Sequence, residues 1–224
     1  MDTTKNLPEV PAEPIVYVVD DDLEMREALL DLFTVTKMRA SAFSSGVEFI
    51  ESADTKAPGC VVVDLRMPGG SGLDLQNQLT SMGSKLPIIF LTAYADIPTS
   101  VRAMKAGACD FLTKPFANQD LLEAVEHAIQ LDSDRREADA EVDQIRLLAD
   151  SLTPREKEVM LAVVRGLMNK QVAYELGISE MTVKLHRMSV MRKMQCRSLA
   201  ALVRCVEQLQ RASGSPLQVG VTSL

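Results

Sequence analysis

Five side chains with useful chemistry each lie where a run of mostly aliphatic residues ends. They are Asp20, Asp21, Asp64, Thr92 and Lys114. In a doubly wound parallel sheet the carboxyl ends of the strands share one edge, and ligands bind in the crevice outside it. We therefore expect three carboxylates, a hydroxyl and an ammonium from distant parts of the chain to meet at one site.

The carboxylates in this set favour a divalent cation. Like charges a few ångströms apart in a partly buried cleft repel one another strongly, and a cation relieves the repulsion. Oxygen ligands suit Mg²⁺ in octahedral geometry. A carboxylate can also attack phosphorus, while Lys114 and the Thr92 hydroxyl can stabilise charge on the incoming phosphoryl oxygens. The set predicts a site for Mg²⁺ and a phosphoryl group.

Each residue alone has an ordinary explanation. An aspartate after a strand often caps the next helix, Thr92 alone would be a loop hydroxyl, and Lys114 alone a surface lysine. Their order, with every member at a strand end, favours the site.

The elements that must position these residues alternate along the first half of the chain. Strands are expected over Ile15–Val19, Arg39–Phe43, Cys60–Val63, Pro87–Leu91 and Phe111–Thr113. Helices are expected over Met25–Thr36, Gly46–Ser52, Ser71–Met82, Thr99–Ala106, and from Asn118 or Asp120 onward. Five βα units of this length predict a doubly wound, flavodoxin-like α/β domain with five parallel strands, over residues 14–129.

A long helical linker is expected over residues 130–150, either as one helix with the element before it or as two abutting helices. Its first part is almost all charged residues and alanine, which is typical of a solvated face. Short tails without periodicity, residues 1–13 and 212–224, are expected to be disordered.

The two halves of the chain carry opposite charge. Residues 1–150 hold 13 Lys and Arg against 26 Asp and Glu, a net of −13. Residues 151–224 hold 11 against 5, a net of +6, and the two together give the overall −7. This asymmetry indicates that the C-terminal part handles nucleic acid or another anionic surface.

The basic part, residues 151–211, has the pattern of four helices. They are expected over Pro154–Arg165 with Thr153 as cap, Lys170–Leu176 with Asn169 as cap, Glu180–Met194 with Ser179 as cap, and Arg197–Leu209. A short helix, a glycine-bearing turn and a longer helix form the helix-turn-helix plan, whose second helix enters the major groove of DNA.

Composition excludes several other classes of protein. The four cysteines form no Cys-x-x-Cys pair and only two histidines accompany them, so we expect buried thiols and no zinc site. No apolar run is long enough to span a bilayer, and the N-terminus lacks the apolar core of a signal peptide. We therefore expect a cytoplasmic protein.

The first domain resembles the receiver domain of bacterial two-component response regulators. The motifs that carry the resemblance are VVDDD (18–22), VVDLRMPGGSG (62–72), LTAY (91–94) and AGACDFLTKPF (106–116). The resemblance covers about Ile15 to Ile129. It implies that Asp64 is the phosphoacceptor, and that Asp20, Asp21, Asp64 and the carbonyl of Arg66 hold Mg²⁺. It also implies a cis Lys114–Pro115 bond.

Further roles follow from the same resemblance. Thr92 and Lys114 would bind the phosphoryl group, and Phe111 would rotate inward together with Thr92 as a switch. Phosphorylation by a sensor histidine kinase would then pair two receivers into a homodimer. The expected dimer face carries Val101, Met104, Lys105 and Asp110.

The C-terminal part is similar to the LuxR-type helix-turn-helix, so the chain resembles the NarL/FixJ family, in its FixJ-like branch. The motifs are LTPREKEV (152–159), GLMNKQVA (166–173), LGISEMTVKLHR (176–187) and KMQCRS (193–198). By this resemblance Lys184, Leu185 and Met188 read the groove of promoter DNA. Lys170, Thr182 and Arg187 contact its backbone, and RNA polymerase is an expected partner.

Two other functions fit part of the pattern. A phosphohydrolase or phosphotransferase with an aspartyl-phosphate intermediate would place a second aspartate two residues after the nucleophile, where this chain has Arg66. A regulator that has lost phosphorylation control would lack a site residue, and none is missing. The favoured function is a phosphorylation-activated transcriptional regulator that is not an enzyme.

Overall fold

The computed structural model describes residues 13–93, 103–105 and 107–213. Contacts divide the chain into two compact units, with the boundary after Arg136.

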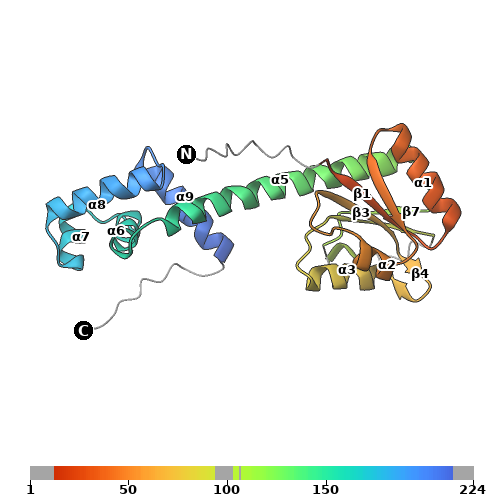
Figure 1. The fold of residues 1–224 in the computed structure, drawn as a ribbon, viewed down its shortest axis with the longest axis horizontal. Coiled ribbons are helices and arrows are strands. Elements are labelled where there is room, and N and C mark those ends of the chain that lie inside the picture. Colours follow the sequence, from red (N-terminus) through yellow and green to blue (C-terminus); the bar gives the residue numbers. More distant parts are fainter. Residues whose placement is uncertain (1–12, 94–102, 106, 214–224) are drawn as a thin grey trace, which may run out of the picture. The chain divides into compact units, whose positions relative to one another are not determined.

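The N-terminal unit is built on one parallel sheet (Figure 1). Its strands are β1 (Ile15–Val19), β2 (Arg39–Phe43), β3 (Gly59–Asp64), β6 (Ile88–Thr92) and β7 (Asp110–Thr113). They pair in the order β2-β1-β3-β6-β7, every pair parallel. This confirms the predicted flavodoxin-like order, in which the chain reverses direction beside β1 and opens a crevice there.

Helices cover both faces of the sheet. They are α1 (Leu23–Val35), α2 (Gly46–Ser52), α3 (Gly72–Ser81) and α5 (Asn118–Asp150). Alternate residues of β1 belong to two separate cores: Val16 and Val18 pack with Phe33 of α1, while Tyr17 packs with Phe49 of α2. Strands buried on both faces explain why the sequence shows continuous apolar runs here and no alternation.

Local side-chain bonds fix the helix starts. Asp22 accepts from two backbone N–H groups at the start of α1, Ser45 caps α2, and Ser71 forms a capping box with Asp74 at α3. These bonds satisfy backbone N–H groups that have no partner within the helix, as occurs at the N-terminus of any helix. One element was not predicted: a small antiparallel hairpin of β4 (Arg66–Met67) and β5 (Gly70–Ser71), directly after Asp64.

α5 is a single helix of 33 residues, which settles the choice between one helix and two. Its part up to Arg136 belongs to the N-terminal unit, beyond the expected limit at residue 129. The buried Asp132 carboxylate accepts from the Gly59 N–H at 3.0 Å and pairs with Arg135 and Arg136. Arg136 also donates to the carbonyls of Lys56 and Ala57. Hydrogen bonds therefore attach the first third of the expected linker to the loop that precedes β3.

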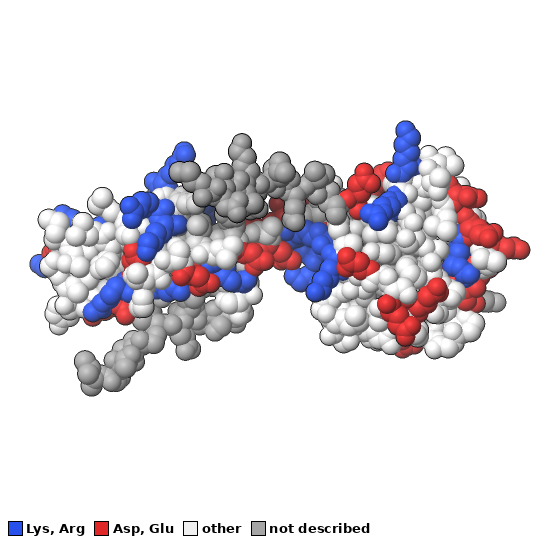
Figure 2. All heavy atoms as spheres, in the orientation of Figure 1, with Lys and Arg blue, Asp and Glu red and all other residues white. Residues whose placement is uncertain are grey.

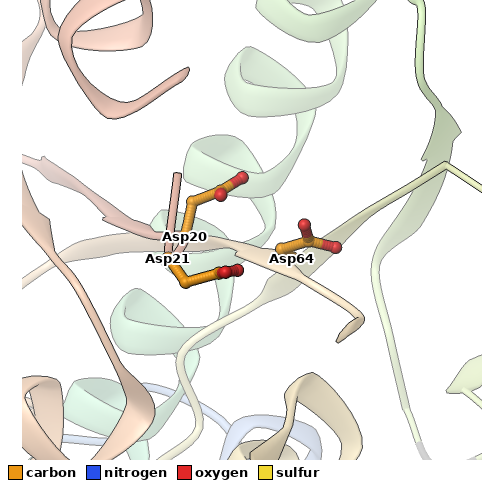
Figure 3. Close-up of side chains that lie close together, drawn as sticks. All are labelled: Asp20, Asp21 and Asp64. Atoms are coloured by element: carbon orange, nitrogen blue, oxygen red, sulfur yellow. The ribbon is translucent and has the colours of Figure 1, made fainter. Parts of the chain in front are cut away.

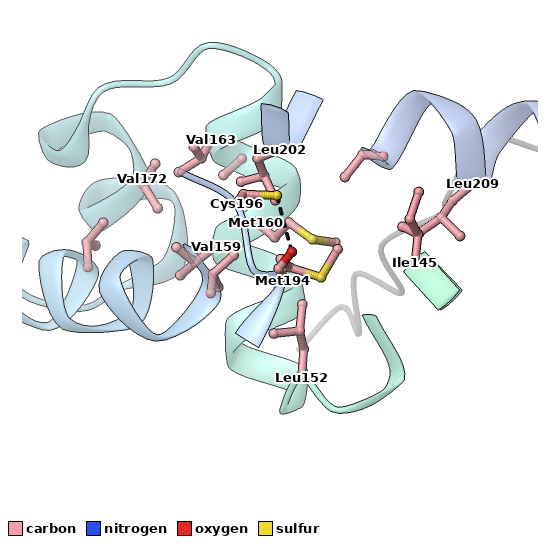
Figure 4. Packing of buried hydrophobic residues seen from close by; sticks show 14 of the residues in the cluster. Ile145, Leu152, Val159, Met160, Val163, Val172, Met194, Cys196, Leu202 and Leu209 are labelled. Carbon is pink, nitrogen blue, oxygen red and sulfur yellow. Dashed lines mark hydrogen bonds between the residues drawn. The ribbon is translucent and has the colours of Figure 1, made fainter. Parts of the chain in front are cut away.

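The C-terminal unit is all helical. It contains the end of α5, then α6 (Pro154–Val164), α7 (Asn169–Leu176), α8 (Glu180–Lys193) and α9 (Leu199–Ser213). Its core joins side chains from every one of these helices, among them Ile145, Val159, Val172, Val190 and Leu202 (Figure 4). The four predicted helices of the basic domain are confirmed.

One predicted helix cap is wrong. Asn169 is the first residue of α7 and not its cap. The cap position belongs to Met168, whose backbone N–H is satisfied by the Gln171 side chain. The Asn169 side chain instead accepts from Arg187 of α8 at 2.9 Å, so a tertiary bond has taken the group that a local cap would use.

Some predictions fall on residues outside the described ranges. The helix predicted over Thr99–Ala106 is described only at residues 103–105, which are helical. Val101 and Tyr94 lie outside the described residues, as do nearly all of the two predicted tails. α9 continues to Ser213, into the start of the predicted C-terminal tail. Among the described residues, no helix combines the length and the apolar character needed to cross a membrane.

Candidate functional site

The three predicted carboxylates meet at the carboxyl edge of the sheet. Asp20 and Asp21 follow β1, and Asp64 ends the neighbouring β3 (Figure 3). Carboxylate oxygens of all three lie within 4.8 Å of one another. Asp20 is almost fully buried, Asp64 is half-buried and Asp21 is exposed, so the cluster opens to solvent on one side.

Lys114 lies over this cluster as predicted. Its Nζ is 2.7 Å from Asp20 Oδ2 and 2.9 Å from Asp64 Oδ2. The lysine follows β7, two strands away from β3 in the sheet, and its backbone N–H donates to the Thr92 carbonyl at 2.7 Å. The Lys114–Pro115 peptide bond is cis, as the resemblance implied. One ammonium therefore pairs with two carboxylates that follow or end different strands, and net negative charge remains at the site.

For both Asp20 and Lys114, burial and the neighbouring groups shift the pKa in opposite directions. Desolvation raises the pKa of Asp20 and outweighs the hydrogen bonds from Lys114 and the Asp22 N–H, which lower it. Burial alone would lower the pKa of Lys114, but its hydrogen bonds to Asp20 and Asp64 prevail and raise it. Lys114 therefore stays charged, and a second cation beside Asp20 would relieve the cost that burial imposes on that carboxylate.

The two predicted switch residues lie on neighbouring strands. Thr92, the last residue of β6, is fully buried, and Phe111 of β7 is half-buried. The Phe111 ring packs against the ring of Phe90 with centroids 6.4 Å apart. Both residues stand in the strands that end at the acidic cluster.

Several groups that hold the site in place were not predicted. The Arg66 N–H donates to Asp64 Oδ1 at 3.1 Å, and Arg26 donates to the Asp20 carbonyl at 2.6 Å. A side chain at Gly72 would meet the Asp64 carbonyl oxygen at 2.7 Å, so only glycine allows α3 to start this close to the site. Gly72 alone of the three glycines in this loop makes the close approach, because a Cβ at Gly69 or Gly70 would meet nothing within 4 Å. Nothing in the sequence singled out Gly72 or Arg26.

The donor set fits a hard divalent cation. Three carboxylates gathered with one open side leave room for water and a phosphoryl oxygen, which is how Mg²⁺ is usually held. The Asp64 side chain already bonds the backbone of Arg66, so the loop that bears the proposed Arg66 carbonyl ligand lies against the cluster.

Of the predicted dimer face, three residues are described. Met104 and Lys105 are exposed in the helical turn before Gly107, and Asp110 is half-buried at the start of β7. The Asp110 carboxylate accepts from the Phe111 N–H at 2.7 Å, which links this face to the switch residue. Val101 falls outside the described residues.

The predicted groove-reading residues share the open face of α8. Lys184 is exposed, and Leu185 and Met188 have 60% and 70% of their surface open to solvent. The opposite face supplies Val183 and Val190 to the core. Exposed apolar side chains beside a lysine suit a groove in which methyl groups and hydrogen-bonding edges alternate.

The predicted backbone contacts differ from one another. Lys170 is exposed in the first turn of α7. Thr182 is half-buried, its hydroxyl 2.8 Å from that of the cap Ser179. Arg187 is half-buried and ties α8 to Asn169, so it orients the two helices of the motif whatever else it contacts.

Two exposed residues near this face were missed by the sequence analysis. Tyr174 of α7 is 92% exposed and Met181, in the first turn of α8, is 66% exposed. The apolar periodicity of both helices hid them, because a tyrosine or methionine in such a helix is expected in the core. Figure 2 shows basic side chains spread over the C-terminal unit, in keeping with the net charge of +6 over residues 151–224.

Comparison with known families matches both units. A model described as the response regulator receiver domain covers residues 16–126. A second, described as bacterial regulatory proteins of the luxR family, covers residues 150–206.

Relatives match along nearly the whole chain. Nodulation protein W of Bradyrhizobium diazoefficiens is 49% identical over 201 residues, which cover 90% of this chain and 88% of that protein. Transcriptional regulatory protein FixJ of Rhizobium meliloti is 40% identical over 192 residues, covering 84% and 93%.

Solved structures give the same result. The response regulator StyR matches with a TM-score of 0.79 at 50% identity, covering 88% of this chain and all of that one. Full-length FixJ from B. japonicum matches with a TM-score of 0.55 at 36% identity, covering 89% and 98%.

Proposed function

The chain belongs to the two-component response regulators that join a receiver to a LuxR-type DNA-binding domain, and we propose that Asp64 is its phosphoacceptor. The family makes it a phosphorylation-dependent transcription regulator with a sensor kinase as partner and DNA as ligand, and not an enzyme. One observation carries the assignment to Asp64. Its carboxylate lies beside Asp20 and Asp21 and accepts a 2.9 Å hydrogen bond from Lys114.

In the proposed reaction, an Asp64 oxygen attacks the phosphorus of a phosphohistidine in the kinase or of a small acyl phosphate. An O–P bond forms while the bond to the imidazole nitrogen or to the acyl oxygen breaks, and the leaving group takes up a proton where it needs one. Lys114 and the Thr92 hydroxyl stabilise charge on the transferred oxygens. Asp20 is too buried to compete as the nucleophile.

We propose Mg²⁺ as the cofactor, held by Asp20, Asp21, Asp64 and the carbonyl of Arg66. Such an ion, when bound, neutralises charge as the phosphoryl group approaches three carboxylates. The Arg66 N–H meanwhile keeps the Asp64 side chain oriented, and Arg26 holds the Asp20 backbone.

Phosphorylation is proposed to act through Thr92 and Phe111 on the face formed by Val101, Met104, Lys105 and Asp110, and to pair two receivers. Lys105 of one subunit and Asp110 of the other would then orient a two-fold contact. An exposed ion pair of this kind contributes only ~0.2–1 kcal/mol, so it would select geometry more than affinity. Sedimentation with and without a phosphodonor tests the step, and a monomer under both conditions would count against it.

The DNA-binding role is proposed to rest on Lys184, Leu185 and Met188 in the major groove, with Lys170, Thr182 and Arg187 toward the phosphate backbone. RNA polymerase is the proposed further partner, since promoter binding regulates transcription through it. The protein would work in the cytoplasm of a bacterial cell, where promoter DNA lies.

Intact-mass measurement tests the phosphoacceptor. Incubation with acetyl phosphate and Mg²⁺ should add one phosphoryl group to the wild-type chain and none to Asp64→Asn. Asp31→Asn is the matched control, because Asp31 is an exposed carboxylate on α1 and should be labelled like the wild type. Undiminished labelling of Asp64→Asn would refute the assignment, and many turnovers of a phosphomonoester would instead favour a phosphohydrolase.

A further inference from the structure

Two thiols lie in contact inside the DNA-binding unit. The Sγ atoms of Cys196 and Cys205 are 3.8 Å apart. Cys196 lies in the turn after α8, two residues beyond the cap position Met194, and Cys205 lies in the second turn of α9. A disulfide requires an S–S distance of about 2.05 Å, so small side-chain rotations would bring the two sulfurs to bonding distance.

The surroundings of the two sulfurs differ. Cys196 belongs to the hydrophobic core, and its thiol donates to the Met194 carbonyl at 3.3 Å (Figure 4). Cys205 is only partly buried and lines a surface pocket together with Glu141, Arg204 and Gln208. A small oxidant can therefore reach Cys205, while Cys196 lies behind it.

Ionisation of Cys196 is disfavoured as well. Burial and the neighbouring Cys205 thiol raise the pKa of Cys196 to about 11, so this thiol is almost never a thiolate at neutral pH. The thiolate is the reactive form of cysteine. Chemical attack on an oxidant should therefore begin at Cys205.

We propose that Cys196 and Cys205 form a reversible intramolecular disulfide when the chain meets a peroxide. The Cys205 thiolate attacks one peroxide oxygen, the O–O bond breaks, and Cys205 becomes a sulfenic acid with release of hydroxide. The Cys196 sulfur then attacks the Cys205 sulfur, loses its proton and displaces the hydroxyl group as water. Two thiols and one hydrogen peroxide thus give one disulfide and two waters, and a dithiol restores the thiols.

The disulfide would join α9 to the turn after α8, the helix that we propose enters the major groove. It would not touch the exposed face of α8. Cys196 lies twelve residues beyond Lys184 in sequence, past the last turn of that helix. The bond would close a loop of only ten residues and restrain the turn at Gln195, whose backbone has a positive φ of 55°. The site is a point at which peroxide acts on the DNA-binding unit independently of Asp64.

Peptide mapping of the full chain tests the proposal. After treatment with hydrogen peroxide and blocking of remaining thiols, trypsin should release residues 194–197 linked to residues 205–211. The intact mass should fall by about 2 Da, and dithiothreitol should reverse the change. The matched control is Cys109→Ser, which removes a half-buried thiol of the receiver and should leave the link unchanged.

Two variants test the order of attack. Cys196→Ala should leave a sulfenic acid at Cys205 that a 1,3-diketone probe captures, whereas Cys205→Ser should give no labelling at Cys196. Circular dichroism of each variant checks that the helical unit is intact. Disulfides between two chains, a link that involves Cys60 or Cys109, or sulfinic acid at Cys205 in the wild type without any link would each overturn the proposal.

Discussion

At the scale of single residues, a small number of hydrogen bonds hold the charged groups of the acidic site together. Lys114 donates to Asp20 and Asp64 from the end of β7, whereas the two carboxylates lie at the ends of β1 and β3. Taken singly, each residue has a common alternative role, and only their convergence supports the proposed phosphoryl site. This convergence in turn requires backbone segments to lie so close together that a larger side chain would not fit between them.

Gly72 provides a test of that close approach. Gly72→Ala would place a Cβ 2.7 Å from the Asp64 carbonyl oxygen and 2.9 Å from a Phe90 ring carbon. We expect a loss of ~1–3 kcal/mol in the free energy of unfolding, typical of an overpacked site, together with slower phosphorylation. Gly70→Ala is the control, since a Cβ there meets nothing within 4 Å. Urea unfolding that gives the same stability for both variants would contradict the packing argument.

Glu156 provides a test of charge inside the C-terminal unit. Hydrogen bonds from Lys193, from Ser189 and from the Thr153 N–H lower its pKa to about 2 from an ordinary 4.5. A lowered folded-state pKa stabilises the fold at pH values above the ordinary pKa, and this stabilisation is lost as pH falls from about 4.5 toward 2.

Glu156→Gln should therefore cost ~1–3 kcal/mol near neutral pH, since charged hydrogen bonds in a buried position are lost. The difference from wild type should shrink as the pH falls below about 4. Calorimetry of the full chain across this range measures it. Glu158→Gln, which removes a more exposed partner of Arg155 on the same helix, should change little at any pH. A stability difference between Glu156→Gln and the wild type that grows as the pH falls would contradict this prediction.

At the scale of elements, one buried carboxylate attaches the part of α5 around residue 132 to the receiver, beyond the apolar residues that pack the start of this helix on the sheet. Asp132 is 1% exposed and bonds to the Gly59 N–H as well as to two arginines. Asp132→Asn should destabilise the receiver by ~3–5 kcal/mol, because it leaves the arginine partners without their counter-charge. Asp143→Asn breaks an exposed pair with Arg146 on the same helix and should cost less than ~1 kcal/mol. Equal losses in denaturant unfolding would mean that the attachment contributes little.

Much of the element structure could be predicted from the sequence. Apolar runs located the five strands, and Thr153 and Ser179 identified helix starts because each caps its own helix through a local bond. The predictions were incomplete where tertiary contacts determine the partner of a side chain. Asn169 bonds to Arg187 and not to its own helix, and Asp132 fastens residues expected in the linker. The carboxylate cluster was predictable from strand ends, whereas the Arg26 and Gly72 contacts depend on spacing in three dimensions.

At the scale of the whole molecule, the charge of each unit matches its ligand. The acidic N-terminal half gathers the three carboxylates that we propose to hold a cation, and the basic C-terminal part carries the lysines that we propose to meet DNA phosphates. A dimer should bind half-sites related by two-fold symmetry, about one helical turn or a multiple apart.

Two exposed lysines should separate in DNA-binding titrations. Lys184→Ala should lose ~1–3 kcal/mol and relax the preference at one base position if this lysine reads guanine. Lys170→Ala should weaken binding to every sequence alike and reduce the salt slope by about one unit, since it neutralises a phosphate. Uniform losses in both variants would make Lys184 a backbone contact and assign specificity to Leu185, neighbouring residues or DNA shape.

The central claim, that phosphoryl transfer to Asp64 controls DNA binding, is tested most directly by fluorescence anisotropy. The probe is a duplex selected from a random library by the acetyl-phosphate-treated protein. Treatment with acetyl phosphate and Mg²⁺ should tighten binding by about tenfold, or ~1.4 kcal/mol, within the usual range of coupling between two sites. Asp64→Asn should bind with the weak affinity under both conditions. An equal gain in Asp64→Asn, or no gain in wild-type protein whose mass shows full labelling, would contradict the account.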